Sequence, residues 1–296
     1  MYLKYIIMKK ILVTGANGQL GNELRSLATK YPAFSFEFTD VQEFDISTAE
    51  SVENYIAASK PDYLINCAAY TAVDKAESDQ DKAYLINSDA PKFLATSSAK
   101  HNCKLVHVST DYVFDGTSYI PYSEEMPIKP VSLYGMSKAM GEKNVTEGNP
   151  QSIIIRTAWL YSSFGGNFVK TMIRLGKERT ELGVVFDQVG SPTYAHDLAD
   201  CILQIISKTE NKSCEWKAGI YHYSNEGACS WYDFTKEIHA AAGITTCHVK
   251  PIETKDYPTP ARRPHFSVFN KKKIKTTFDI EIPYWKTSME ECIKLL

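Results

Sequence analysis

The sequence carries almost no net charge, and this excludes two classes of partner. Its 33 lysines and arginines nearly balance its 35 aspartates and glutamates, so the formal net charge is −2 at pH 7. Without a global positive field, nothing attracts nucleic acid or an anionic membrane surface. The short basic run Lys271-Lys272-Lys273 is expected to be a solvated face or loop. We therefore predict no nucleic-acid partner and no membrane partner.

Cysteine pairs and targeting segments are also missing. The seven cysteines are odd in number and scattered, with no Cys-x-x-Cys pair, which argues against a disulfide framework or a zinc site. The apolar stretch 1–8 is too short for a signal peptide or a spanning segment, and Met8 is an alternative start. A reducing compartment fits this pattern, so the cytoplasm is the expected location.

Strands and helices alternate through the first half of the sequence. The run 10–14 is short, apolar and rich in β-branched residues, which is typical of a parallel strand buried on both faces; further strands are expected at 34–39, 63–69, 104–109 and 152–157. Helices are expected over 19–30, 81–101 and 134–146. A further helix is expected to begin at a capping box at Ser47–Glu50. The alternation predicts an α/β fold, a Rossmann-like doubly wound parallel sheet with right-handed crossovers.

This rhythm ends after Trp159. Further helices are expected near 167–178, 195–207 and 285–295, and another is expected to begin at a cap at Ser230–Asp233. Strands are expected near 182–186 and 220–224. We expect residues 8–160 to form a dinucleotide-binding domain, with a return segment at 193–224. Residues 161–296 would mainly form a smaller, partly interleaved C-terminal substrate lobe over the carboxyl edge of the sheet.

A glycine-rich loop joins the first strand to the first helix. Gly15, Gly18 and Gly21 are spaced by three residues, in the strand-to-helix context that a dinucleotide fingerprint requires. Glycines permit a tight turn and a close backbone approach, and the helix N-terminus offers free N–H groups to a pyrophosphate. A glycine-rich turn without a ligand is the alternative. We predict a cofactor site at Gly15, with Gly18, Gln19 and Leu20 closest to the phosphates.

The ends of the next strands supply further cofactor candidates. Asp40 follows the glycine loop by about 20 residues and is placed to bond the adenosine ribose, or else to begin a turn. A carboxylate there opposes a 2′-phosphate and favours NADH, whereas Arg25 is a candidate for reaching that phosphate, so NADPH and NADH both remain open. The other candidates are Asp45 and Ile46 beside the adenine, and Ala69, Tyr70 and Thr71 near the nicotinamide ribose, where packing alone would also select small residues.

One of three Tyr-x-x-x-Lys patterns has a context for catalysis. Unlike Tyr5/Lys9 and Tyr232/Lys236, the pair Tyr134/Lys138 follows a strand that ends in hydroxyl residues. A free tyrosine titrates near ~10, too high for efficient proton transfer at neutral pH. A lysine one helical turn away stabilises the phenolate and can also reach the nicotinamide ribose. We predict that Tyr134 transfers the proton, with Lys138 as its partner.

The preceding strand supplies a hydroxyl and a carboxylate. Ser109 and Thr110 must take opposite faces of the strand, so only one can face the site, and Thr110 would donate a hydrogen bond to the substrate oxygen. Asp111 is either a substrate contact or the start of a turn. No consecutive acidic pair follows Thr110, so there is no obvious acid and base for eliminating water. The catalytic side chains are expected to converge in one cleft beside the glycine loop.

Longer segments resemble the extended short-chain dehydrogenases and, within them, the dTDP-4-dehydrorhamnose reductases. The glycine and Tyr-Lys motifs mark only the superfamily, whereas Ser-Thr-Asp-Tyr-Val-Phe-Asp-Gly at 109–116 and Asp-Gln-Val-Gly-Ser-Pro-Thr at 187–193 are much more specific. Other matching segments run through most of the chain, at 66–77, 134–142, 156–161, 166–172 and 263–267.

The resemblance implies reduction of the 4-keto group of dTDP-4-dehydro-L-rhamnose to dTDP-L-rhamnose, with NADPH or NADH as the reductant. It implies that Tyr134 is the proton donor, Lys138 its partner and ribose anchor, and that Thr110, Asp111 and Trp159 contact substrate, although Trp159 also fits a core position. The alternatives are another nucleotide-sugar reductase or epimerase of the same fold, and a non-catalytic subunit similar to the regulatory subunit of methionine adenosyltransferase.

The resemblance also raises a metal, because some relatives dimerise around a divalent ion held by carboxylates. Glu23 matches one such position, but His196 stands where a glutamate would follow the Ser-Pro-Thr turn. We therefore predict no metal site and expect a monomer or a homodimer.

Overall fold

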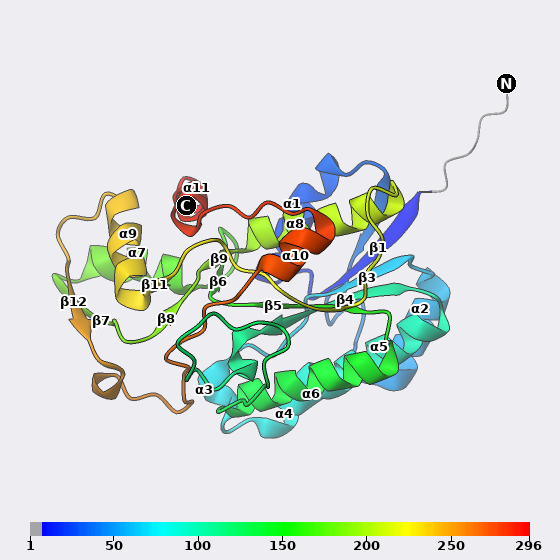
Figure 1. Cartoon of the computed structure of the whole chain (residues 1–296), viewed down its shortest axis with the longest axis horizontal. Coiled ribbons are helices and arrows are strands. Elements are labelled where there is room, and N and C mark those ends of the chain that lie inside the picture. Colours follow the sequence, from blue (N-terminus) through cyan, green and yellow to red (C-terminus); the bar gives the residue numbers. More distant parts are fainter. Residues whose placement is uncertain (1–7) are drawn as a thin grey trace.

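A parallel six-stranded sheet runs through the larger part of the molecule (Figure 1). The structure is a computed structural model that describes residues 8–296, so Tyr5 and the rest of the apolar stretch 1–7 lie outside the described residues. The strand order is β10-β5-β4-β3-β1-β2. The strands are β1 (Lys9–Thr14), β2 (Phe34–Phe38), β3 (Tyr63–Asn66), β4 (Lys104–Thr110), β5 (Ile153–Thr157) and β10 (Gly219–His222). The predicted α/β fold is confirmed.

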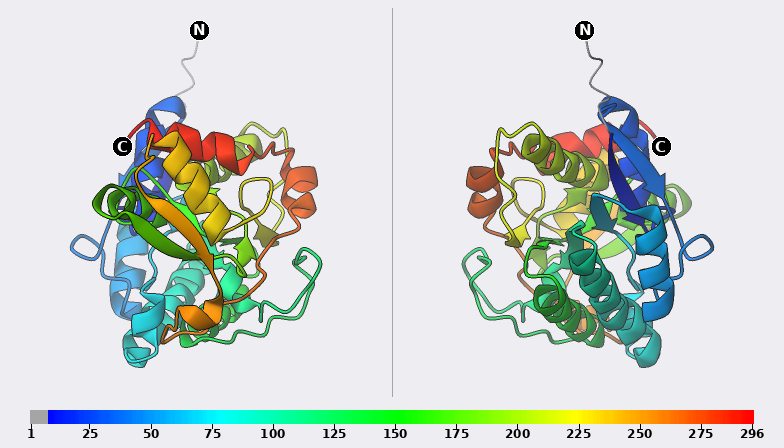
Figure 2. Two further views of the ribbon diagram at one scale, coloured as in Figure 1. Left: turned by 90° about the vertical axis from the view of Figure 1, so that its left-hand side faces the viewer. Right: turned by 90° about the vertical axis from the view of Figure 1, so that its right-hand side faces the viewer.

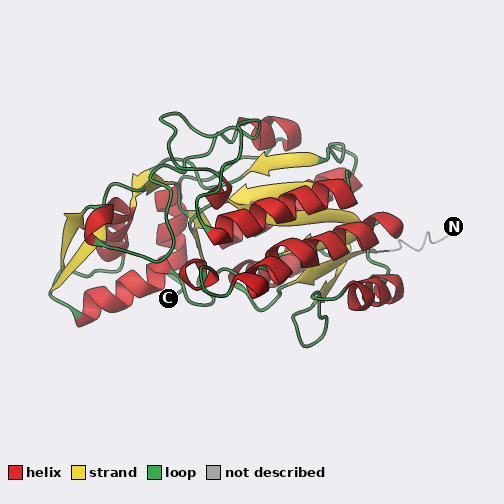
Figure 3. Cartoon of the chain, turned by 90° about the horizontal axis from the view of Figure 1, so that it is seen from below, coloured by secondary structure: helices red, strands yellow, loops and turns green. Residues whose placement is uncertain are grey.

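Helices bury both faces of this sheet, because successive side chains on each strand point to opposite faces. On one face, Ile11 and Val13 pack against the first helix layer; on the other, Leu12 and Leu64 pack against the second layer. Figure 3 shows helices lying along the sheet when it is seen from below. The first layer contains α1 (Gln19–Leu27), α8 (Ala195–Glu210) and α10 (Lys272–Phe278), and the second contains α2 (Ala49–Ser59), α5 (Ala90–Lys100) and α6 (Leu133–Gly148).

The direction of winding reverses at β1. This strand pairs with β2 on one side and β3 on the other, so the chain passes over β1 between its second and third strands. In an open parallel sheet such a reversal leaves a crevice outside the carboxyl ends of the strands. Gly15, Asp40 and Cys67 follow the ends of β1, β2 and β3. The predicted cofactor residues therefore surround this crevice.

A smaller lobe with its own hydrophobic core lies beside the sheet, at the left of Figure 1 and facing the viewer in the left panel of Figure 2. It contains α7 (Phe168–Glu178), β7 (Glu181–Val185), α9 (Trp231–Ala241), β12 (His248–Ile252) and α11 (Trp285–Ile293). Between its segments the chain returns to the sheet, where α8 joins the first helix layer and β10 pairs with β5. The exact domain boundaries stay a prediction.

Shorter elements connect these layers. The strand pairs are β6 (Leu160–Tyr161) with β9 (Thr193–Tyr194), and β8 (Val189–Gly190) with β11 (Cys229–Ser230). Two short helices, α3 (Val73–Ala76) and α4 (Gln80–Tyr84), follow β3, and 3-10 turns lie at Ala28–Lys30, Asp111–Val113 and Thr254–Asp256. Within the described part of the chain, no helix has both the length and the apolar character needed to cross a bilayer.

A π-helical turn at Leu85–Asp89 interrupts the helix predicted over 81–101. The turn places Asn87 so that its side chain bonds both the backbone N–H (2.9 Å) and the carbonyl (3.0 Å) of Tyr70. The same amide donates to the Ser137 hydroxyl at 3.1 Å. Insertions of this kind are frequent at functional sites, and this one connects the loop after β3 to α6.

Two local expectations need correction. Helix α2 is capped by Thr48, whose side chain accepts from Ser51 N at 3.3 Å, because Ser47 instead donates its N–H to the Asp45 carboxylate. The solvated position expected for Lys271 is wrong. Its side chain is 6% exposed, and its ammonium lies 3.1 Å from Asn225 O and 3.4 Å from the Glu226 carboxylate. By contrast, the capping box at Ser230–Asp233 is confirmed.

Candidate active site

The glycine loop lies directly against the backbone that follows β3. Gly15 has φ = +65°, and a Cβ at this position would lie 2.6 Å from Ala68 N. A Cβ on Gly21 would lie 2.5 Å from Ala16 Cα. Only glycine fits such close backbone approaches. Gly18 is the N-cap of α1 and has no side chain to occupy the first-turn N–H groups, which leaves them available to an anion.

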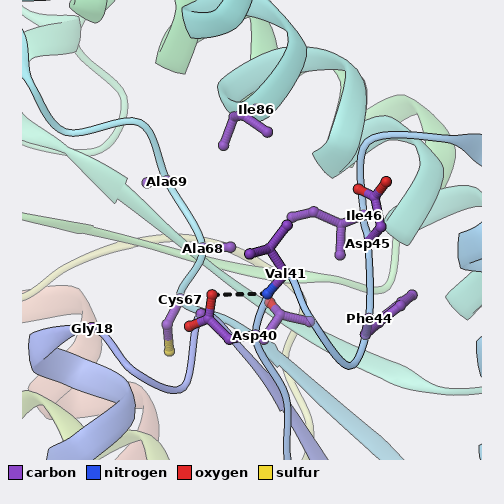
Figure 4. A pocket seen from close by; sticks show the side chains of 12 residues that line it. Gly18, Asp40, Val41, Phe44, Asp45, Ile46, Cys67, Ala68, Ala69 and Ile86 are labelled. Carbon is purple, nitrogen blue, oxygen red and sulfur yellow. Dashed lines mark hydrogen bonds between the residues drawn. The ribbon is translucent and has the colours of Figure 1, made fainter.

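A cavity of about 270 Å³ occupies the crevice between β1 and β3 (Figure 4). Its described lining contains two carboxylates and no lysine, arginine or histidine. Four apolar side chains form a wall suited to a flat base, and one of them, Phe44, is itself stacked on Tyr55 with the ring centroids 4.1 Å apart. The lining residues are Thr14, Gly15, Gly18, Asp40, Val41, Phe44, Asp45, Ile46, Cys67, Ala68, Ala69 and Ile86.

The Asp40 carboxylate is fixed at the edge of this cavity. Its Oδ2 accepts from Asn17 N at 3.0 Å, and its Oδ1 accepts from Val41 N at 2.8 Å, the bond drawn in Figure 4. Its own N–H donates to the Glu43 carboxylate at 3.0 Å. Arg25 lies over the Phe38 ring, 4.9 Å from its centroid, and does not line the cavity.

The structure brings six of the predicted cofactor residues to this cavity, namely Gly15, Gly18, Asp40, Asp45, Ile46 and Ala69. Five others lie outside its lining, namely Gln19, Leu20, Tyr70, Thr71 and Lys138. Leu20 is packed in the core under α1, and the Gln19 amide accepts from Asn167 Nδ2 at 3.0 Å, so their backbone N–H groups are what remains for phosphate. The Tyr70 hydroxyl donates to Asp79 at 3.0 Å, and Thr71 is exposed.

Sequence reasoning missed six lining residues, of which Thr14 is the last residue of β1. Cys67 and Ala68 directly follow β3, so their position at a strand end was a usable signal. Val41 and Phe44 lie in the turn after Asp40, where apolar residues beside a ribose contact also form a recognisable pattern. Ile86 comes from the π-helical turn, and no signal in the sequence indicated its position.

Tyr134 lies in the first turn of α6, and that turn packs tightly against Tyr112. Ser132 caps the helix by accepting from Gly135 N at 3.2 Å, and the rings of Tyr134 and Tyr112 make an edge-to-face contact with centroids 5.3 Å apart. Burial raises the pKa of Tyr134 to about 12, although a hydrogen bond from Thr110 acts in the opposite direction. The phenol is therefore protonated at neutral pH, as a proton donor must be.

Lys138 lies one turn further along α6 and is 2% exposed. Its ammonium donates to the Val108 carbonyl at 2.7 Å. Burial lowers the pKa of Lys138 to about 8, while the nearby Glu142 carboxylate raises it, and the Cys67 thiol also lies close to the ammonium. Cys67 also lines the cavity, whereas Thr110, Tyr134 and Lys138 are not among its lining residues, so the expected convergence of the catalytic side chains in one cleft beside the glycine loop stays a prediction.

The end of β4 directs its two hydroxyls to opposite faces. Ser109 donates to the Glu142 carboxylate at 2.6 Å, and Thr110 lies beside Tyr134. Asp111 is buried and accepts from the Thr110 hydroxyl at 3.0 Å, while its Oδ2 has no hydrogen-bond partner among the described residues. Burial raises the pKa of Asp111 to about 6, while the nearby Ser267 and Thr110 hydroxyls act in the opposite direction. A buried oxygen of this kind is suited to a ligand hydroxyl.

Trp159 connects the sheet to the lobe in a strained conformation. Its φ of +50° is rare for a bulky residue. Its ring stacks on Trp231 with centroids 3.5 Å apart, and a Cβ on Gly190 would lie 2.6 Å from it. The side chain is half-buried and touches both the core of the lobe and the cluster around Phe114. Core packing explains this position as well as substrate contact does.

The residues around Glu23 do not fit a metal. Both of its carboxylate oxygens have internal partners, the Ser162 hydroxyl at 2.5 Å and His196 Nδ1 at 3.1 Å. Among residues 8–296 there is no group of three or more His, Cys, Asp or Glu side chains placed to hold an ion.

Comparison with known proteins gives full-length matches. A family described as the RmlD substrate binding domain matches residues 8–296. A dTDP-4-dehydrorhamnose reductase from Aggregatibacter actinomycetemcomitans is 41% identical, over 96% of this chain and 98% of that protein. Two solved dTDP-4-dehydrorhamnose reductases superpose closely. The one from Clostridium acetobutylicum is 45% identical, with a TM-score of 0.90, covering 97% of this chain and 99% of its own. The one from Bacillus anthracis, in complex with NADP, is 38% identical, with a TM-score of 0.92, and the match covers 98% of this chain and 100% of that chain.

Proposed function

This chain belongs to the dTDP-4-dehydrorhamnose reductase family, and on that premise we propose that it reduces the 4-keto group of dTDP-4-dehydro-L-rhamnose, yielding dTDP-L-rhamnose. Thr110, Tyr134 and Lys138 are the proposed catalytic residues. The observation that supports this most directly is the placement of a protonated Tyr134 beside Thr110, one helical turn before a buried lysine that lies near Cys67, a lining residue of the glycine-loop cavity.

The residues present fit a nicotinamide dinucleotide. Gly15 and Gly21 tolerate no Cβ, and the first turn of α1 offers N–H groups to a pyrophosphate. Asp40 would hold the adenosine ribose, and the apolar wall around Phe44 the adenine. When bound, the reduced nicotinamide supplies the hydride for the carbonyl carbon.

Tyr134 supplies the proton for the carbonyl oxygen, so the keto group becomes a hydroxyl. Because burial holds the pKa of this phenol at about 12, the proton is present at neutral pH but costly to release. Lys138 lowers that cost, since an ammonium one turn away stabilises the phenolate that is left. Thr110 turns its hydroxyl proton from Asp111 toward the same oxygen and orients it. Tyr134 then regains a proton from solvent.

The direct test is turnover with purified protein. We expect dTDP-4-dehydro-L-rhamnose to be converted to dTDP-L-rhamnose with stoichiometric oxidation of NADPH or NADH, followed by loss of nicotinamide absorbance and by mass spectrometry. dTDP-glucose, which has no keto group, serves as the control and should cause no oxidation. If the dinucleotide binds but the ketosugar is unchanged, another ketosugar or a non-catalytic role takes the place of this proposal.

Replacing Asp40 by serine is expected to change the ratio of the NADH and NADPH dissociation constants by about tenfold or more, which corresponds to ~1.4 kcal/mol. The fixed carboxylate bonds a ribose hydroxyl but repels a 2′-phosphate, so NADH binding should weaken and NADPH binding should strengthen. Equilibrium titration of each dinucleotide measures both constants.

Two further variants sharpen this comparison. Glu147→Gln removes an exposed carboxylate of α6 outside the cavity lining and should leave both constants unchanged. Arg25→Gln should also leave NADPH binding unchanged, because this guanidinium lies over Phe38. An unchanged ratio in Asp40→Ser would show that Asp40 does not select the cofactor, and weaker NADPH binding in Arg25→Gln would assign the 2′-phosphate to that arginine.

We place the reaction in the cytoplasm. All seven cysteines fall within residues 8–296 and are free, which fits a reducing compartment. For the assembly we retain a monomer or a homodimer, which sedimentation equilibrium distinguishes.

A further inference from the structure

A buried chain of hydrogen bonds lies beneath the catalytic helix, and the proposed reaction does not use it. Glu142 is 3% exposed and lies four residues after Lys138 on α6, so the two side chains share one face of the helix. Its Oε1 accepts from the Ser109 hydroxyl at 2.6 Å and from Arg156 Nε at 2.8 Å. Its Oε2 accepts from Arg156 Nη2 at 2.7 Å.

Arg156 is also buried and continues this network of hydrogen bonds. It lies on β5, is 2% exposed, and its Nη1 is 3.3 Å from His222 Nε2. His222 Nδ1 donates to the Tyr122 carbonyl at 3.0 Å, which leaves Nε2 as the acceptor. Burial and the nearby guanidinium lower the pKa of His222 to about 3. His222 is therefore neutral, and within this network of hydrogen bonds Glu142 is the group that balances the charge of Arg156.

The other titratable groups around Lys138 carry no charge at neutral pH. Cys67, after β3, has its thiol pKa raised by burial. His107, on β4, has its pKa lowered by burial and by Lys138 itself. Tyr134, on the same helix, is a protonated phenol. Glu142 is thus the one anionic side chain among the groups that act on this ammonium.

We propose that Glu142 is a positioning residue that keeps Lys138 protonated in its buried site, and that Arg156 limits this effect by sharing the carboxylate. The proposal rests on the proposed role of Lys138 as the partner of Tyr134. Burial withdraws hydration from an ammonium and favours its neutral form, whereas an opposite charge one helical turn away favours the charged form. Arg156 occupies both oxygens of that carboxylate, so it weakens the field that reaches Lys138.

This arrangement matters because Lys138 titrates close to physiological pH. Its pKa of about 8 results from burial opposed by Glu142, so a change in the balance moves Lys138 between its charged and neutral forms. A neutral Lys138 no longer stabilises the phenolate of Tyr134. The ion pair under the helix would therefore set the upper pH limit of the reaction.

The test compares two variants whose effects should have opposite signs. Lysine loses its proton as pH rises through its pKa, so a lower pKa brings the loss of activity to a lower pH. Glu142→Gln removes the attraction and leaves Arg156 unbalanced, and the alkaline limb of kcat/KM should move down by about one pH unit or more. Arg156→Gln leaves the Glu142 charge unshared, and the same limb should move up.

A second readout does not depend on turnover. The pH dependence of the Lys138 side-chain ¹³C chemical shift, assigned by comparison with Lys138→Arg, reports the lysine pKa directly and should shift in the same two directions. If the wild type shows no turnover but these titrations shift as expected, the proposed function fails while the role of Glu142 stands.

Removing one partner of a buried ion pair can unfold a protein, so the double variant Glu142→Gln/Arg156→Gln completes the set. It leaves no unbalanced buried charge and should be more stable than Glu142→Gln alone, with a lysine pKa between those of the two single variants. A purely structural ion pair would lower stability in both single variants without moving the titration. An unmoved titration, or shifts in the same direction, would overturn the proposal.

Discussion

Replacing Tyr134 by phenylalanine is expected to lower kcat by about 10²–10⁴-fold, the usual contribution of a positioned proton donor. The substitution removes only the hydroxyl, so the edge-to-face contact with the Tyr112 ring remains and cofactor affinity should stay within about twofold of the wild type. Steady-state turnover of dTDP-4-dehydro-L-rhamnose and equilibrium titration of the dinucleotide measure the two quantities separately.

The chain contains its own control for this experiment. Tyr232 begins another Tyr-x-x-x-Lys pattern, on α9 in the smaller lobe, and Tyr232→Phe should leave kcat within about twofold. If Tyr134→Phe instead keeps most of its activity, the proton comes from another group. Asp111 would then be the first candidate, because burial raises its pKa to about 6.

Replacing Gly135 by alanine is expected to lower kcat/KM by about 10²-fold, because a displacement of ~1 Å at a catalytic group can cost that much. A Cβ on Gly135 would lie 2.2 Å from the Tyr112 carbonyl oxygen, so α6 must move away from the backbone beside Thr110. The melting temperature should fall as well, and thermal unfolding measures it. Alanine is intrinsically better than glycine in a helix by ~1 kcal/mol, so any loss of stability reports the clash.

Two further glycine substitutions serve as comparisons, one with a similar clash and one with none. Gly141→Ala would place a Cβ 2.0 Å from the Asn87 carbonyl, at the π-helical turn, and should also destabilise the protein. Gly166→Ala has no atom within 4 Å of the new Cβ and should behave as the wild type. An active and stable Gly135→Ala variant would mean that the position of α6 is not critical for catalysis.

The strands and the glycine loop were predictable because their physical requirements are local. A strand buried on both faces is apolar at consecutive positions, which made runs such as 10–14, with Ile11, Leu12 and Val13 at its centre, recognisable. The close approach of Gly15 to Ala68 admits no side chain, so glycine marks that position in the sequence. The Tyr134/Lys138 pair was identified by its place after a strand end. All these signals depend on residues close together in the chain.

The parts that were missed depend on contacts between distant segments. Nothing in the pattern of 81–101 reveals an inserted residue, because Asn87 takes its place from the Tyr70 backbone, 17 residues away. Lys271 is in a basic run, yet Asn225 and Glu226 give its ammonium buried partners. The role proposed for Glu142 is of the same kind, since this residue lies on α6 and its partner Arg156 comes from β5.

The position of β10 at the end of the sheet has a consequence for how the protein folds. This strand pairs with β5, but α7 and β7 of the smaller lobe lie between the two strands in the sequence and are synthesised before β10. Until residues 219–222 emerge, β5 presents an unpaired strand edge to other chains, and unpaired edges promote aggregation. Its pairing also closes a long loop, which slows folding. The six-stranded sheet is therefore completed only after part of the substrate lobe has been made, and a chain ending near residue 160 would lack the strand that covers the edge of β5.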